Sequence, residues 1–375
     1  MSVKLYSAAT IEKAQWTGNP YADYARRYLV PLVADPGHYI KNIHTPLHVA
    51  MVDQLPIPFS EVEWHPNNSY TASPFSQYIS YGIEELRELG QPLLERIFAR
   101  LLRQIGRYFQ RCNFDHALLV NNWFLSTNLY PEILGEQIEQ LHHTFLREYP
   151  KRALVWRSVD TQGGAEPLNH LRRLGYMPIF SRQVWYQDPT SSQTTKRNTF
   201  KTDARLLRKT PYRVIPAAEI DPDRAVNLYN QLYLDKYSTL NPQFTPAFIR
   251  LAQANRILEM IGFERDGRLD AVMGYFGRGR LMTPPLFGYD LALDRKLGLY
   301  RLLSARFSQE AARLGKTAHF SAGVGEFKRN RGAYGVLEYN MVYVGHLPPS
   351  RRRPWQLLKL ILDRLAVPII TSRGL

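Results

Sequence analysis

The feature that most constrains the fold is a β-hairpin in the second half of the chain. Ile257–Gly279 reads as two strands of largely apolar residues joined by Arg265-Asp266-Gly267. An Asp-Gly turn between such strands is a strong hairpin signal. The second half therefore contains an antiparallel sheet, and an all-helical fold is excluded.

The elements around this hairpin alternate between strand and helix. A cap is predicted for each of the first two helices, with Asp221 at the N-cap and Pro222 at the first position of one, and Thr245 capping the other. We predict strands at Tyr212–Pro216, Pro285–Leu293, Thr317–Val324 and Glu338–Leu347, helices at Asp223–Tyr237, from Pro246 and over 298–314, and a short basic loop or helix at Glu326–Ala333. The resulting order is β-α-α-β-β-β-α-β-α-β, which is an α/β pattern with a mixed sheet.

The first half also mixes strands and helices. Strands are predicted at His48–Val52, Phe75–Gly82, His116–Leu125, Ala153–Val159 and Ser181–Tyr186, and helices at Pro92–Arg111, Glu136–Glu148 and Glu166–Leu174. Pro92–Arg111 is amphipathic, because its apolar residues recur at helical spacing while Arg96, Arg100, Arg103 and Arg107 lie on another face.

A polar segment separates the two halves. Asp188–Thr210 is rich in small and charged residues and is predicted to be a linker or long loop. We therefore expect two domains, residues 1–195 and 196–375. Gly175–Tyr186 and Gly332–Tyr343 each run from a glycine after a helix to an aromatic strand, which either a duplication or chance would explain.

The composition indicates the cellular compartment and the kind of partner to expect. The 375 residues include one cysteine, Cys112, so neither an internal disulfide nor a cysteine-based zinc site is expected. The first 16 residues lack an apolar signal core, and no apolar run approaches 18 residues, so we expect a cytoplasmic protein without a transmembrane segment. The net charge of +15 favours acidic partners, namely phosphorylated cofactors, acyl carrier protein, nucleic acid or anionic membrane surfaces. The positive charge is densest at Lys196, Arg197, Lys201, Arg205, Arg208, Lys209 and Arg213, and again at Arg351, Arg352 and Arg353.

The stretch Arg295-Lys296-Leu297-Gly298-Leu299-Tyr300 stands at a predicted strand–helix junction. With the element order, it resembles the Arg/Gln-x-x-Gly-x-Gly/Ala signature of GNAT acyltransferases, although Tyr300 replaces the final small residue. The resemblance implies an acyl thioester donor, acyl-CoA or acyl carrier protein, with its pyrophosphate held by Arg295, Lys296 and Gly298 at the helix start. Free backbone N–H groups and the helix dipole bind anions at such a position.

The segment after the next strand contains Phe327-Lys328 within a basic, glycine-containing run. This resembles the Fem-type and BioF2-like branch of the same superfamily, in which two GNAT-like lobes share one chain. The resemblance implies that each lobe is a mixed, mostly antiparallel sheet flanked by helices. It also implies a catalytic second lobe, a degenerate first lobe on the acceptor side, and Phe327 and Lys328 beside the donor. Lys328 would stabilise an oxyanion or hold a donor phosphate.

Amide formation needs a group that takes up the amine proton. Tyr289 and Asp290 on one strand, and His319 and Ser321 on the next, lie near the expected opening between the strands. Tyr334 or Tyr339 would protonate the leaving thiolate. For each of these residues a purely structural role is the alternative, since a lone strand histidine is commonly a core residue.

Three functions fit these observations. The first is an N-acyltransferase that moves an acyl or fatty acyl group to an amine of a small molecule or peptide, without a metal. The second is Fem-like transfer from aminoacyl-tRNA, which the positive charge would suit. The third is a nucleic-acid-binding module without activity. His48 and Asp53 match the spacing of a glycerolipid acyltransferase dyad but fall on a predicted strand without that family's other motifs.

Overall fold

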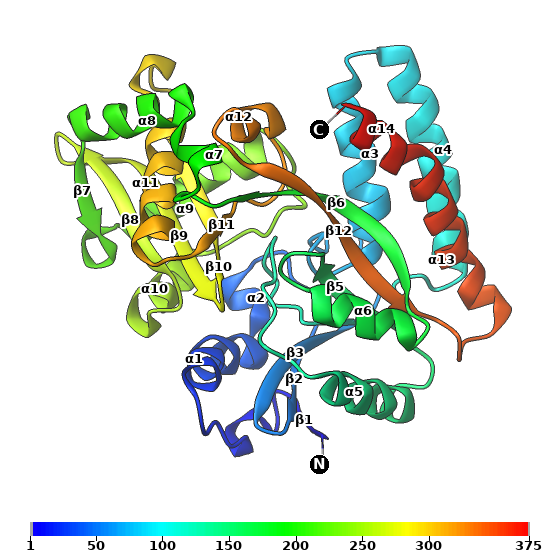
Figure 1. The fold of residues 1–375 in the computed structure, drawn as a ribbon. Helices are drawn as coiled ribbons and strands as arrows, with labels where there is room; N and C mark the ends of the chain where they lie inside the picture. Colours follow the sequence, from blue (N-terminus) through cyan, green and yellow to red (C-terminus); the bar gives the residue numbers. More distant parts are fainter. Residues whose placement is uncertain (1–2, 374–375) are drawn as a thin grey trace.

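A single mixed sheet runs through the molecule and joins two lobes (Figure 1). The computed structural model describes residues 3–373. Within them the strands follow the order β1-β2-β3-β4-β5-β12-β6-β11-β10-β9-β8-β7. The predicted α/β class is confirmed, with helices on both faces of a mostly antiparallel sheet.

The strands fall into two sets with the same internal plan. The first lobe holds β1 (Val3–Tyr6), β2 (Leu47–Val52), β3 (Leu55–Val62), β4 (Ala117–Val120) and β5 (Ala153–Val159). The second holds β7 (Arg213–Pro216), β8 (Glu259–Arg265), β9 (Arg268–Arg278), β10 (Leu281–Tyr289) and β11 (Thr317–His319). Each set ends in a parallel pair, β4 with β5 and β10 with β11, linked by a helix. The two lobes therefore repeat one topology.

Two long strands cross between the lobes. β6 (Met177–Gln187) follows the first lobe in sequence but pairs with β11 of the second, at Ala318 and His319. β12 (Tyr334–Tyr343) follows the second lobe but pairs with β5 of the first. The two strands also pair with each other, so each lobe is completed by a strand that follows the other lobe in the chain. The predicted strand at Glu338–Leu347 corresponds to β12, which therefore lies between β5 and β6.

Helices cover both faces of each lobe. In the second lobe, α9 (Pro222–Asn230) and α10 (Pro246–Asn255) share one core with α1 (Pro20–Ala34), whereas α11 (Leu299–Arg313) shares the core on the opposite face. Neighbouring residues of β9 divide between these cores, because side chains alternate along a strand. In the first lobe, α5 (Gly135–Glu148) and α6 (Ala165–Arg173) cover one face, and α4 (Pro92–Arg111) and α13 (Pro349–Ile361) the other.

Short elements connect these layers. They are α2 (Pro36–Tyr39), a π-helical turn at Ser76–Ser80 followed by α3 (Tyr81–Glu85), α7 (Ser192–Thr195), α8 (Asn198–Lys209), a 3-10 turn at Arg295–Leu297, α12 (Gly325–Arg329) and α14 (Val367–Arg373). No helix in the described part of the chain is long and apolar enough to cross a bilayer.

Two predicted strands are shorter than expected, since β4 ends at Val120 and β11 ends at His319, before Ser321, and two other predicted elements differ in kind. Phe75–Gly82 is helical rather than a strand, because Asp115 accepts the Phe75 amide at 2.7 Å and Ser73 accepts the Ser76 amide at 2.9 Å, which starts a helical turn. The supposed linker Asp188–Thr210 contains α7 and α8. α8 is held against the second lobe by buried Asp203, which forms ion pairs with Arg301 and Arg331. The division at residues 195 and 196 stays a prediction.

Candidate functional site

The β10–β11 pair separates soon after it begins. The strands align only at Leu281–Thr317 and Met282–Ala318, after which β10 continues to Tyr289 paired with β9 and no longer with β11. Near the far end of β10 lies a cavity of about 410 Å³, here called the α11 cavity. It is lined by Lys236, Tyr289, Asp290, Leu291, Leu293, Asp294, Arg295, Gly298, Leu299, Tyr300 and Arg301. Four predicted site residues, Tyr289, Asp290, Arg295 and Gly298, therefore meet in one cavity.

The start of α11 forms one wall of this cavity. Gly298 is the N-cap and has φ of +66°, a left-handed conformation that favours glycine. A Cβ atom there would lie 2.9 Å from Cδ2 of Leu206 on α8. Because the first amides of a helix have no partner inside it, those of α11 are suited to an anion at this point. Lys236 and Arg295 are exposed at the same cavity and add positive charge.

Asp290 and Tyr289 differ in their protonation. Burial raises the pKa of Asp290, but hydrogen bonds from Arg224 at 2.7 Å and the Ala292 amide at 3.0 Å outweigh it and leave the pKa below its usual value. Burial raises the pKa of Tyr289. At neutral pH Asp290 is therefore a paired carboxylate, and Tyr289 keeps its proton.

Lys328 and Phe327 line a second cavity, of about 260 Å³, between α8, α11 and α12. The Lys328 side chain is buried, and its Nζ donates to the carbonyls of Phe320 at 2.8 Å, Ser321 at 3.3 Å and Ala322 at 2.7 Å. Burial, with the charge of Arg182, lowers the pKa of Lys328. These three hydrogen bonds hold the loop that follows β11. They use all three N–H donors of the ammonium, so none is free to bind a substrate in this arrangement. Phe327 packs against Tyr300 at the edge of the α11 cavity.

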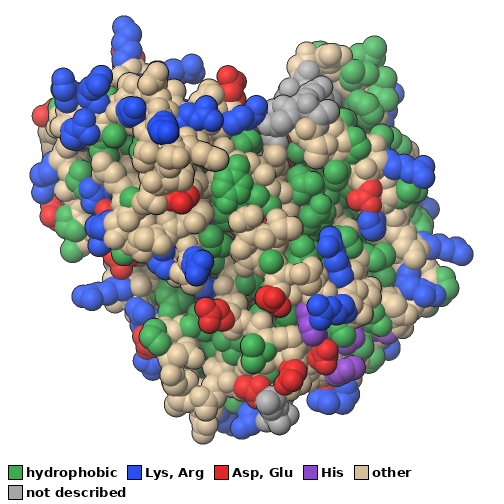
Figure 2. Space-filling view, viewed as in Figure 1, with side chains coloured by type: hydrophobic (Ala, Val, Ile, Leu, Met, Phe, Trp, Pro, Cys, Tyr) green, Lys and Arg blue, Asp and Glu red, His purple; other side chains and the backbone are tan. Residues whose placement is uncertain are grey.

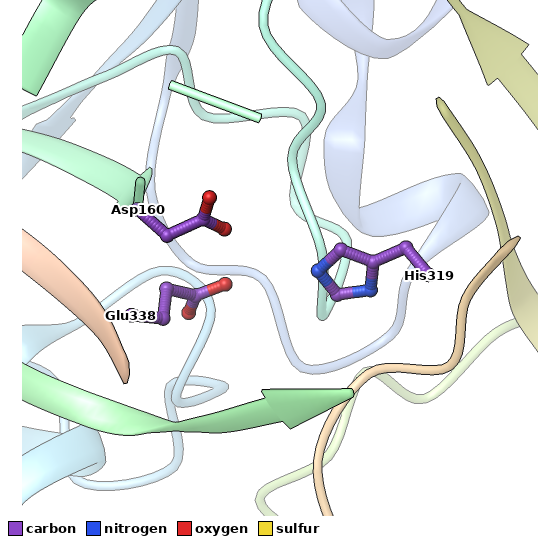
Figure 3. A group of neighbouring side chains, drawn as sticks. All are labelled: Asp160, His319 and Glu338. Atoms are coloured by element: carbon purple, nitrogen blue, oxygen red, sulfur yellow. The ribbon is translucent and has the colours of Figure 1, made fainter. Parts of the chain in front are cut away.

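His319 faces a polar group between the lobes (Figure 3). Ligand atoms of Asp160, at the end of β5, of His319, at the end of β11, and of Glu338, on β12, lie within 4.8 Å of one another. Nδ1 of His319 accepts the Ser321 amide at 3.0 Å, which leaves Nε2 to carry the proton. Burial, with the charges of Arg182 and Lys328, lowers the pKa of His319 to about 3. The imidazole is therefore neutral at physiological pH.

Asp160 and Glu338 each have hydrogen-bond donors within the protein. Asp160 accepts from the amides of Gln162 and Gly163 and from the Tyr186 hydroxyl, each at 2.7 Å. Glu338 forms an ion pair of 2.9 Å with Arg182. The three side chains are of the type that ligates a divalent cation, but the guanidinium beside Glu338 supplies the positive charge that a cation would bring.

Arg182 and Glu338 form one wall of a third cavity, also of about 410 Å³, here called the inter-lobe cavity. Arg157 also lines it, and burial lowers the pKa of this guanidinium to about 10. Residues from α3, β6, the loop after β11 and α14 complete the walls, for example Tyr81, Gln183, Gly323 and Ile370. Buried Arg157, half-buried Arg182 and buried Glu338 make this cavity suited to a polar or charged ligand.

None of Arg157, Asp160, Arg182 and Glu338 was selected from the sequence. The available signal was a charge inside an apolar strand, as in Ala153–Val159 and Tyr334–Tyr343. Backbone strain marks the same place, since Ser158 and Ser321 have φ of +57° and +56°. Non-glycine residues in this conformation concentrate at functional sites. Tyr334 is partly exposed and stacks on Tyr186, and Tyr339 packs near Phe180.

A basic surface lies beside the α11 cavity. On α7 and α8 and the flanking residues the exposed cations are Lys196, Arg197, Lys201, Arg205, Arg208 and Lys209. Figure 2 shows Lys and Arg side chains gathered at the upper left, over these helices. Leu206 of α8 approaches Gly298, so this basic surface adjoins the start of α11. Lys296 is exposed on the same turn as Arg295.

The topology of each lobe, a parallel pair that opens beside a connecting helix, repeats along the chain. The chain therefore consists of two lobes with one topology. Solved structures with this likeness include a tandem GNAT protein from clavulanic acid biosynthesis, at 10% identity and TM-score 0.38 over 91% of this chain and 98% of that one.

Two further solved structures each match 60% of this chain. FemX matches at 11% identity and TM-score 0.44 over 60% of this chain and 79% of its own. The C-terminal domain of a putative lysylphosphatidylglycerol synthetase from Agrobacterium fabrum matches at 13% identity and TM-score 0.45, over 60% and 78%. No family model and no curated protein matches the sequence. Identities this low concern the fold alone and leave donor and acceptor open.

Proposed function

We propose that this protein is an acyltransferase that takes its acyl group from a phosphorylated thioester, CoA or acyl carrier protein, and transfers it to an amine. The observation that supports this most is the α11 cavity, in which Arg295, Lys236 and Gly298 surround the start of α11 where β10 and β11 have separated. A pyrophosphate would be held there by the helix amides and by two cations.

The amine acceptor would enter from the inter-lobe cavity. Arg157, Arg182 and Glu338 there suit an acceptor that carries charge of either sign. The amine nitrogen would form a C–N bond to the acyl carbonyl while the C–S bond breaks. One amine proton would leave to a base and the thiolate would take up a proton.

The predicted catalytic residues would divide this work. Tyr289 keeps its proton and lines the α11 cavity, so its hydroxyl would protonate the thiolate. Asp290, paired with Arg224, would position the neighbouring tyrosine. Lys328 would act through the loop Phe320–Ala322 that it holds, and Phe327 would shield the donor from water. His319 and Tyr334 would belong to the acceptor side, next to Asp160.

Calorimetry with CoA tests the donor site. Arg295→Ala should weaken CoA binding by about 1.5–3 kcal/mol, the usual cost of a lost hydrogen bond to a charged group. Arg280→Ala is the matched control, because Arg280 is exposed next to the opposite end of β10. Equal affinities for wild type and Arg295→Ala would contradict the assignment of the phosphate site.

A second candidate is transfer from aminoacyl-tRNA, which the basic surface on α7 and α8 favours. Such binding would fall steeply with salt, because each phosphate contact releases counterions. Native mass spectrometry of the purified protein separates the two candidates. Co-purified CoA, acyl-CoA or acyl carrier protein supports the first, and tRNA supports the second.

A further inference from the structure

The longest helix of the first lobe presents its large apolar residues to solvent. On α4, Leu93, Ile97 and Leu101 are 70%, 50% and 53% exposed, and Leu94, Phe98 and Tyr108 are exposed as well. A surface helix normally turns such a stripe toward the core. On α4 the stripe is turned outward.

The inner face of α4 consists of two small residues and one phenylalanine. Ala99, Gly106 and Phe109 are its buried residues. A Cβ atom on Gly106 would lie 2.9 Å from Cγ2 of Ile79, so the helix approaches the protein closely along this side. At 100° per residue, Ile97 and Leu101 project from the side opposite Ala99 and Gly106. The exposed stripe is therefore a consequence of how the helix is seated, and repacking cannot bury it without expelling Phe109 from the core.

A row of arginines borders this stripe. Arg96, Arg100, Arg103, Arg107 and Arg111 are all exposed and fall between the inner face and the apolar stripe, whereas Glu95 is the one acidic residue of α4. Leu360 and Leu365 add exposed apolar area next to it on α13 and the turn that follows. Figure 2 shows hydrophobic side chains at the upper right, where α4 lies, and Lys and Arg side chains along the right-hand edge.

We propose that α4, with the adjoining end of α13, docks on the surface of a bilayer that contains anionic phospholipid. An interfacial helix needs an apolar face for the acyl-chain boundary and basic residues for the headgroups, and α4 has both. A second copy of the chain is a poorer occupant. A symmetric pair would bring the arginine rows of both copies into one interface, with only Glu95 of each α4 as an acidic partner. The docked helix lies in the plane of the interface and does not span the bilayer.

Vesicle co-sedimentation tests this docking. Wild-type protein should sediment with vesicles of phosphatidylglycerol and phosphatidylcholine, and much less with phosphatidylcholine alone. Ile97→Ser with Leu101→Ser should lower the partition coefficient about ten-fold or more, since two large side chains no longer enter the interface. Arg100→Gln with Arg107→Gln should lower it about five-fold per arginine, and only on anionic vesicles.

Val214→Ser is the control, because Val214 is a 41% exposed residue of β7, at the other end of the sheet. It should sediment like wild type. Thermal unfolding should be unchanged in the α4 variants, since the residues they replace are exposed. Wild-type protein that stays in solution with phosphatidylglycerol vesicles overturns the proposal. A dimer in analytical ultracentrifugation that Ile97→Ser with Leu101→Ser abolishes would overturn it too, and would assign the stripe to a second copy.

Discussion

The neutral imidazole of His319 and the half-buried guanidinium of Arg182 share the space between the lobes. His319 cannot take up a proton readily there, because burial and the charges of Arg182 and Lys328 oppose it. Arg182 stays charged because Glu338 pairs with it at 2.9 Å. Replacing either partner of this pair would leave a buried charge without its counterion.

His319 should make folding stability depend on pH. Its pKa is about 3 in the folded chain and about 6.5 when unfolded, so only the unfolded chain takes up the proton between these values. The stability it contributes is complete above pH 6.5 and is lost as pH falls toward 3, by at most about 1.4 kcal/mol per pH unit. His319→Asn keeps an acceptor for the Ser321 amide but does not titrate. Its free energy of unfolding in urea should fall less steeply than that of wild type from pH 6.5 to 4.5.

The interval above pH 7 serves as the internal control, because His319 is neutral there in both states and the two slopes should agree. Parallel curves below pH 6.5 would show that the buried imidazole is protonated in the folded protein.

At the residue scale, the sequence allowed some of the residues that line the α11 cavity to be grouped together. Tyr289, Asp290, Arg295 and Gly298 were identifiable because they are close in sequence, at one strand–helix junction. Asp160 and Glu338 approach His319 only because β6 and β12 cross between the lobes. No local pattern encodes that pairing, so the inter-lobe group could not be predicted.

At the scale of single elements, the predictions succeeded where the signal was local. The caps Asp221 and Thr245 accept the amides of Arg224 and Phe248, as expected from their residue types. A strand was wrongly predicted where the helix at Ser76 begins. The amide of Phe75 there is accepted by Asp115, about forty residues further along the chain, so no local pattern marks the helix start. α8 was missed because its ion pairs with Arg301 and Arg331 are tertiary.

The start of α11 should be sensitive to the loss of one glycine. Gly298→Ala places a side chain at φ of +66°, which costs about 1–2 kcal/mol, and also brings Cβ to 2.9 Å from Leu206. Gly315→Ala is the matched control at the other end of the helix, with φ of +61° and no atom within 4 Å of the new Cβ. We expect Gly298→Ala to lower the free energy of unfolding more than its control, and to weaken CoA binding as well. Equal losses in urea unfolding would mean that the contact with Leu206 relaxes freely.

At the scale of the whole molecule, the exchange of β6 and β12 makes the folding of each half depend on the other half. Residues 1–195 lack the β12 partner of β5, and residues 196–375 lack the β6 partner of β11. α1 adds a shared core, since Tyr28 packs on Phe248 of α10. The division at 195 and 196 stays a prediction, and β6 and β12 pair across it.

Splitting the chain tests this dependence. Fragments 1–195 and 196–375 should each be poorly soluble when expressed alone, because each exposes unpaired strand edges. Expressed together, they should co-purify and unfold in one transition. The intact chain, expressed and purified in the same way, is the reference for solubility and for the unfolding transition. Two stable, monomeric halves would contradict the dependence.

The crossing of β6 and β12 also sets an order of events at the ribosome. β5 is made long before its neighbour β12, and at 5–20 residues per second the interval is roughly 10–35 s. Throughout that interval the open edges of β5 and β6 are available to other nascent chains. Neither lobe can be completed until translation is nearly over, so a chaperone that shields nascent strand edges should raise the yield of this protein more than that of a chain whose lobes close in sequence.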